Sequence, residues 1–188
     1  MDKVGYSISR QPSREENFAF PYNSVLHIGL NMVAGFVDDV AAWTARIDDN
    51  LNWIEQNVQT YKDQVEIVVI YGHTGMIYEY RDFFLSLRKS IIQWNSEIVD
   101  IVSGRTRNLS VLYVKESSNI WSLKRQYLGV EQFMLLNVQA TKWPPMRVYI
   151  DPNKDELRLE QNDWFEDLVG INTDNVKGEN DKYRKKAS

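Results

Sequence analysis

Hydrophobic and polar residues recur along the chain with periods that predict its secondary structure. An unbroken apolar run, Ile67–Tyr71, ends abruptly at Gly72-His73-Thr74-Gly75. Continuous β-branched residues bounded by glycine are typical of a strand that is buried on both faces. We therefore expect a central strand here, with helices packed on one or both sides of it.

Two segments on either side of this strand have the three- and four-residue spacing of amphipathic helices. The first is predicted from about residue 40 to about residue 61, with Asp38 and Asp39 placed to cap its start. The second is predicted from about residue 78 to 102, and Ser103-Gly104 would end it. The expected buried positions are Trp43, Ile47, Leu51 (or Ile54) and Val58 in the first helix, and Phe83, Phe84, Leu87, Ile91, Trp94, Ile98 and Ile101 in the second.

Shorter apolar runs predict further strands. Phe18, Phe20 and Tyr22 alternate as in an edge strand. Other predicted strands lie at residues 24–31, 109–114, 133–138, 146–151 and 157–159. Proline- and asparagine-containing turns separate the last three strands and favour an antiparallel meander. The order of elements predicts an α/β (α+β) fold, a β-α-β-α-β layer followed by an antiparallel β-meander.

The same patterns predict three regions. Residues 1–23 form a polar amino-terminal segment, and residues 24–166 contain nearly all the periodic apolar positions. Residues 167–188 lack such a pattern and end in the basic run Lys182-Tyr183-Arg184-Lys185-Lys186, so we expect a disordered tail.

Composition limits the classes of function. The chain has 188 residues, 43% of them hydrophobic, which is enough for a core. Its net charge of −4 argues against nucleic acid as a partner, because binding phosphates needs a basic face. It has no cysteine, so disulfides are excluded. No apolar run has the roughly 20 residues of a membrane span, and no signal peptide is visible at Met1. We expect a soluble protein, intracellular or organellar unless a targeting segment was removed.

The loop after the central strand is the first candidate site. Ligands of open α/β sheets bind at the carboxyl ends of the strands, where His73 lies with Gly72, Thr74 and Gly75. His73 could be a metal or phosphate ligand, but a loop histidine bonded to backbone is the favoured interpretation. His27, inside an apolar strand, is interpreted as a packed or surface-facing strand residue.

Several segments, in order, resemble calcineurin-like metallophosphoesterases over roughly residues 10–160. They are Glu16-Asn17-Phe18-Ala19-Phe20, Leu26-His27-Ile28-Gly29-Leu30-Asn31, Trp43 with Arg46, Asn50 and Trp53-Ile54, Val68-Val69-Ile70-Tyr71-Gly72-His73, Val111-Leu112-Tyr113-Val114, Trp121, Asn137-Val138-Gln139 and Pro144-Pro145-Met146-Arg147-Val148-Tyr149-Ile150-Asp151. The resemblance implies a two-sheet sandwich with two divalent metal ions, which activate a bridging hydroxide and clamp a phosphate ester.

The resemblance also indicates which ligands are missing. The amino-terminal half of the family domain, with its aspartate- and asparagine-bearing loops, has no counterpart before Val25. Gly72-His73 matches one family loop, but Lys115 and Asn119 stand where further histidines are expected. A lysine brings positive charge to a site that needs negative or neutral donors. Arg46 matches a family arginine, for which a structural salt bridge is favoured over phosphate contact.

These observations predict a degenerate pseudoenzyme that holds no metal cofactor. The leading hypothesis is a non-catalytic accessory protein that packs against a partner chain or a second copy, because a half-domain leaves strand edges and an apolar sheet face uncovered. The alternative is a metal-dependent phosphoesterase completed by a partner or by upstream sequence. A third is a module that keeps a phosphate or nucleotide pocket near Gly72–Gly75.

Overall fold

The computed structural model describes residues 7–33, 37–97, 108–117, 121–139, 147–151 and 156–160. The chain divides into two compact units, Met1–Ala140 and Thr141–Ser188, and each is described by itself. Predictions that fall outside the described residues are Asn119, Ile98, Ile101, the helix end at Ser103-Gly104, Pro144-Pro145 and the basic tail.

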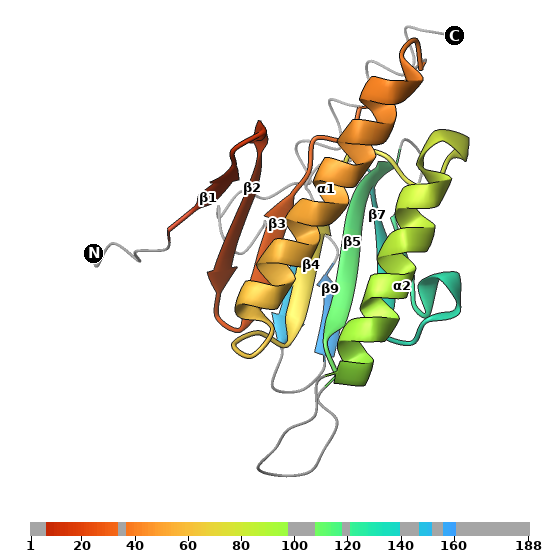
Figure 1. The fold of residues 1–188 in the computed structure, drawn as a ribbon. Coiled ribbons are helices and arrows are strands. Elements are labelled where there is room, and N and C mark those ends of the chain that lie inside the picture. Colours follow the sequence, from red (N-terminus) through yellow and green to blue (C-terminus); the bar gives the residue numbers. More distant parts are fainter. Residues whose placement is uncertain are drawn as a thin grey trace, which may run out of the picture. The chain divides into compact units, whose positions relative to one another are not determined.

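The first unit is built on a seven-stranded mixed sheet with the order β1-β2-β3-β4-β5-β7-β6. Its parallel centre consists of β3, β4, β5 and β7, with the antiparallel strands β1 and β2 on one side (Figure 1). On the other side, the antiparallel strand β6 pairs with β7. The strands are β1 Ser9–Gln11, β2 Arg14–Tyr22, β3 Val25–Gly29, β4 Ile67–Tyr71, β5 Ser110–Ser117, β6 Ser122–Lys124 and β7 Phe133–Gln139.

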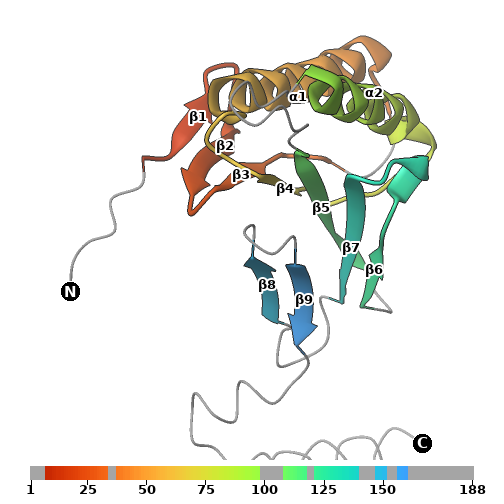
Figure 2. The same cartoon turned by 90° about the horizontal axis from the view of Figure 1, so that it is seen from below.

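Both helices of this unit lie on one face of the sheet (Figure 2). Helix α1 (Val40–Tyr61) connects β3 to β4, and helix α2 (Arg81–Glu97) lies between β4 and β5. Parallel strands need such crossover connections, and an amphipathic helix covers the sheet while it makes the connection. The α/β class predicted from the sequence is therefore confirmed.

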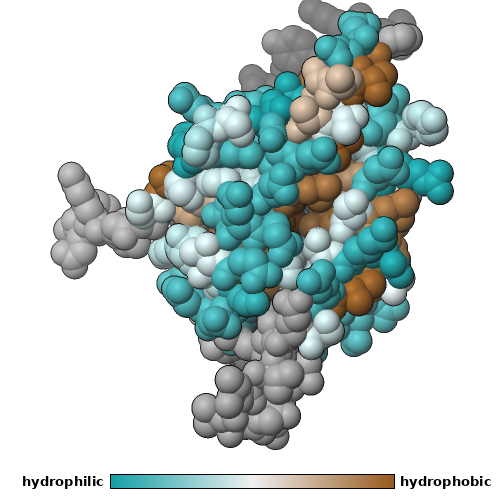
Figure 3. All heavy atoms as spheres, in the orientation of Figure 1, coloured by the Kyte–Doolittle hydropathy of each residue, from teal (hydrophilic) through white to brown (hydrophobic). Residues whose placement is uncertain are grey.

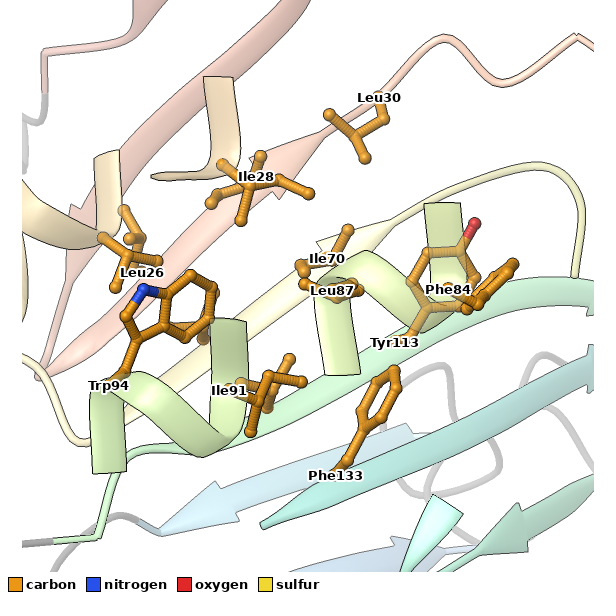
Figure 4. Close-up of a cluster of buried hydrophobic side chains, with 14 of the residues drawn as sticks. Leu26, Ile28, Leu30, Ile70, Phe84, Leu87, Ile91, Trp94, Tyr113 and Phe133 are labelled. Carbon is orange, nitrogen blue, oxygen red and sulfur yellow. The ribbon is translucent and has the colours of Figure 1, made fainter. Parts of the chain in front are cut away.

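The core lies between these helices and the sheet. Leu87, Ile91 and Trp94 of α2 point toward strand residues such as Ile70 and Phe133 (Figure 4). The Trp94 indole also donates a hydrogen bond to a Glu55 carboxylate oxygen on α1, at 3.0 Å, which joins the two helices. The predicted buried residues of α2 up to Trp94 are confirmed, and so are Ile54 and Val58 of α1.

The structure confirms one predicted helix start and corrects the other. The Asp39 carboxylate accepts a hydrogen bond from the Ala42 backbone N–H at 3.0 Å, as expected of an N-cap. The second helix begins at Arg81 and not at residue 78, because residues Tyr78–Tyr80 form the short 3₁₀ helix η1. A tight 3₁₀ turn commonly precedes an α-helix, and hydrophobic spacing does not distinguish the two.

The sheet edges also differ from the prediction. β2 is not an edge strand, because β1 pairs with it in an antiparallel arrangement. β1 and the opposite edge strand β6 have three residues each, too few for a periodic pattern to reveal. The run at residues 133–138 is β7, which pairs parallel to β5 and antiparallel to β6. In the described part of the main sheet, both edge strands are therefore short.

The second unit contains an antiparallel pair, β8 (Arg147–Asp151) and β9 (Glu156–Glu160). The antiparallel pairing predicted for these strands is confirmed. The Arg147 guanidinium donates a hydrogen bond to the Tyr149 hydroxyl at 2.6 Å and lies 5.5 Å from the centre of its ring. None of the helices in the described parts of either unit is long and apolar enough to cross a membrane.

Candidate functional site: a cleft at the carboxyl edge of the sheet

The loop after β4 borders a cleft where two parallel strands end. β4 and β5 run in the same direction, so the loop that follows Tyr71 lies beside the last residues of β5. The cleft has a volume of about 360 Å³. Its lining residues are His73, Thr74, Gly75, Met76, Ile77, Lys115, Glu116 and Ser117. The predicted position of the candidate site, beside the carboxyl end of the central strand, is where this cleft lies.

Tyr113 of β5 holds the loop after β4 in place. Its hydroxyl donates a hydrogen bond to the Thr74 carbonyl oxygen at 2.7 Å. Burial raises the pKa of Tyr113 above its usual value, so the hydroxyl keeps its proton and remains a donor even in alkaline solution. Gly72 lies directly over this hydroxyl, and a Cβ atom there would clash with it. The glycine is therefore required by a close approach of backbone to side chain.

Lys115 packs against the same loop. A Cβ atom built on Gly75 would lie only 2.7 Å from Cδ and 2.8 Å from Cε of Lys115. The Lys115 ammonium donates a hydrogen bond to the Glu116 carbonyl oxygen at 2.8 Å. The apolar stem of the lysine thus covers a glycine while its charged end stays at the cleft, a common arrangement for this side chain. Both residues were predicted near the site from the sequence, but this contact between them was not.

His73 and Glu116 form the acid–base pair of the cleft. His73 Nδ1 lies 3.2 Å from a Glu116 carboxylate oxygen, and the two side chains are 61% and 47% exposed. Sequence reasoning missed Glu116, although its position at the end of β5, beside the end of β4, was a usable signal. Because both groups are solvated, the pair contributes little to stability.

The donor set of the cleft does not fit a two-metal centre. Within the part of the chain that the structure describes, no group of three or more His, Cys, Asp or Glu side chains could hold a metal ion. The cleft brings together one imidazole and one carboxylate, with Lys115 beside them. Two divalent ions need several anionic ligands, and a neighbouring ammonium opposes them.

Arg46, the remaining predicted binding residue, belongs to a different cluster. It lies on α1 and forms an ion pair with Glu16 of β2, with a nitrogen–oxygen distance of 3.7 Å. A backbone hydrogen bond, and after it the Asn31 side chain, lower the pKa of Glu16. The structure therefore places Arg46 in a contact between helix and strand and outside the lining of the cleft.

A buried amide network lies next to Arg46. The Asn17 side chain is fully buried and donates to Gln11 and to Asn50, each at 2.7 Å. Its oxygen accepts a hydrogen bond from the Asn31 backbone N–H at 2.6 Å. The network ties β1, β2 and α1 to the segment after β3. Sequence periodicity missed it, because buried amides occupy positions where the pattern expects apolar residues.

His27 lies on the sheet face away from the helices. Its ring stacks on Phe20, with 4.8 Å between ring centres, and its Nδ1 lies 3.0 Å from the Tyr71 hydroxyl. Burial lowers the pKa of His27. The contacts are those of a packed strand residue, consistent with the interpretation made from the sequence.

Comparisons with known proteins add no assignment to this geometry. No family model, curated protein or solved structure matches the chain. The function therefore has to be inferred from the residues of the cleft and the surface around it, and the family relationship stays a hypothesis from the sequence.

Proposed function

We propose that this chain is a non-catalytic accessory protein, derived from a calcineurin-like phosphoesterase, that packs against a partner chain in a larger assembly. The observation that carries the proposal is the position of Lys115. Its stem covers Gly75, and its ammonium lies at the cleft beside His73 and Glu116. A site that once held metal ions would then present a fixed positive charge instead.

Lys115 makes the cleft less favourable for a metal ion. A divalent cation is held by groups that are negative or neutral, and each added positive charge in the same cleft raises the free energy of the bound ion. Of the side chains that line the cleft, Glu116 supplies one negative charge and His73 supplies a nitrogen donor. Lys115 offsets that charge. The side chains of the cleft thus favour loss of metal-dependent hydrolysis.

Support for a partner comes from apolar side chains next to the cleft. Met76 and Ile77 line it and are 40% and 41% exposed. Scattered exposed apolar residues are normal on protein surfaces, whereas several together commonly mark an interaction site. A partner that covers them would gain the free energy of removing that surface from water.

The experiment is to purify the tagged full chain from its native source and to measure the mass of the complex that it forms. We expect a stable complex of defined stoichiometry, in which chemical cross-links join a second polypeptide or a second copy to this chain. A chain that migrates as a free monomer in native extract, under conditions that preserve other complexes, would contradict the proposal.

The second candidate is a metal-dependent phosphoesterase completed by ligands from a partner or from upstream sequence. The specific observation in its favour is the His73–Glu116 pair, two exposed side chains of ligand type at the carboxyl edge of the sheet. Crystals of the native complex soaked in manganese test it. Two well-occupied ions beside His73 would establish the second candidate, and no anomalous signal at that position would eliminate it.

A further inference from the structure

A patch of exposed apolar side chains surrounds the point where both helices begin. It consists of Val33 after β3, Val40 at the start of α1, and Met76, Ile77 and Tyr78 after β4. Tyr78 is 89% exposed and Val40 is 71% exposed. These five, which we call the edge patch, are more than half of the nine large hydrophobic residues that are exposed in the described parts of the chain. Figure 3 shows hydrophobic atoms at this end of the helical face.

Hydrogen bonds hold the three segments of the edge patch together. The Tyr80 hydroxyl donates to the Val33 carbonyl oxygen at 2.9 Å. The Trp43 indole donates to the Glu79 carbonyl oxygen at 3.2 Å, and the rings of Trp43 and Tyr80 lie 5.1 Å apart. Val33 after β3, the segment after β4 and the start of α1 are thus joined through the buried Tyr80 and the half-buried Trp43. A surface fixed in this way binds at a lower entropic cost than a loose loop.

The charges around the edge patch are mainly negative. Asp38 and Asp39 precede Val40, and Glu79 and Asp82 follow Tyr78. The cations of the same region are Arg81, three residues after Tyr78, Lys115, which lines the cleft together with Ile77, and Arg46, which acts electrostatically on Tyr80. Arg46 is paired with Glu16, so the four carboxylates outnumber the two remaining cations and surround an apolar centre. An apolar centre with a charged rim is the usual composition of an interface.

We propose that the edge patch binds a partner segment whose apolar side chains are flanked by lysine or arginine. The proposal deepens the accessory function given above and depends on it. The apolar anchors would cover Ile77, Tyr78 and Val40, while the basic flanks would face Asp38 and Asp82. Charge complementarity selects this occupant over an acidic one, because like charges at the rim would repel an acidic segment.

The test uses two synthetic peptides and the full chain. One peptide is an amphipathic helix with leucine anchors and lysine flanks, and its twin carries glutamate in place of each lysine. Binding is followed by fluorescence anisotropy at low salt. We expect the chain to bind the lysine peptide more tightly than its glutamate twin. This binding should weaken as salt is added, because ions screen exposed charges.

Three variants localise the binding. Tyr78→Ser should lower the affinity for the lysine peptide by roughly tenfold, a loss typical of truncating a central aromatic anchor. Asp38→Asn should reduce the preference for lysine over glutamate. Ile92→Ser is the matched control, because Ile92 is exposed on α2 away from the edge patch. It should leave the affinity for both peptides unchanged. Circular dichroism melting curves verify that each variant is folded.

The outcomes separate this proposal from the proposed function. Equal binding of the two peptides, no binding of either, or insensitivity to Tyr78→Ser overturns the assignment of the edge patch. A native partner that cross-links elsewhere on the chain would still leave the accessory function standing. Metal-dependent turnover would refute the accessory function while the peptide result continued to stand.

Discussion

Two glycines of the cleft loop are in close contact with side chains of β5, and at Gly72 the contact leaves no room for a larger side chain. Gly72 lies over the Tyr113 hydroxyl, and Gly75 lies under the stem of Lys115. A glycine in such a place is fixed by the neighbouring side chain more than by its own backbone freedom. The sequence marks both glycines clearly, but it does not name the side chain that packs on each of them.

Gly72→Ala should destabilise the protein. The added methyl group would clash with the Tyr113 hydroxyl, and forcing extra volume into a packed site costs about 1–3 kcal/mol. Urea unfolding of the full chain measures the change in the free energy of unfolding. In a Tyr113→Phe background, which removes the hydroxyl oxygen, the same substitution should cost less. An equal cost in both backgrounds would show that contact with the hydroxyl is not the cause.

His27 should make stability depend on pH. Its ordinary pKa of 6.5 applies to the unfolded chain, and burial lowers the pKa in the folded protein. The unfolded chain therefore binds the proton first as the pH falls. The contribution of His27 is fully present above the unfolded pKa and is lost as the pH falls through the folded pKa.

The measurement is the free energy of unfolding between about pH 7.5 and pH 5, a window above the range in which most carboxylates titrate. We expect stability to decrease toward pH 5, with a smaller slope in His27→Gln. A slope in His27→Gln as steep as in the parent would contradict the assignment.

Among the helices and strands, those with a long apolar pattern are predicted from the sequence, and the very short ones are missed. β3, β4 and β5 stand out as apolar runs, and α1 and most of α2 have a repeating apolar period, so the sequence predicted all five. β1 and β6 have three residues each, and tertiary pairing alone creates them. Buried amides such as Asn50 interrupt the apolar stripe of α1 and conceal the network that they build. Residues that meet only through pairing of distant strands, such as His73 and Glu116, need the sheet register to be recognised.

Asp39→Ala should weaken the start of α1. The Asp39 carboxylate accepts the Ala42 N–H, and loss of such a cap costs about 1 kcal/mol. Asp39→Asn keeps an acceptor oxygen and should recover most of the loss, whereas Asp38→Ala should have little effect, as no cap bond to Asp38 is part of this helix start. Thermal unfolding, followed by circular dichroism, compares the three variants. Equal melting temperatures for Asp39→Ala and the parent would refute a capping role.

At the scale of the whole molecule, the unit Met1–Ala140 has one face of a sheet covered by two helices and a carboxyl edge that carries both the cleft and the edge patch. The fold class followed from the sequence because helices and strands alternate in it. The balance of charge in the cleft did not, since it depends on which side chains the strand ends bring together. The proposed loss of hydrolysis therefore depends on the side chains of the cleft more than on the fold.

Hydrolysis of a generic phosphodiester by the full chain, with and without manganese, tests the account most directly. The account predicts no turnover above the uncatalysed rate in either condition, and no difference between the parent and His73→Ala. Turnover that requires manganese, increases in proportion to protein concentration and disappears in His73→Ala would contradict it.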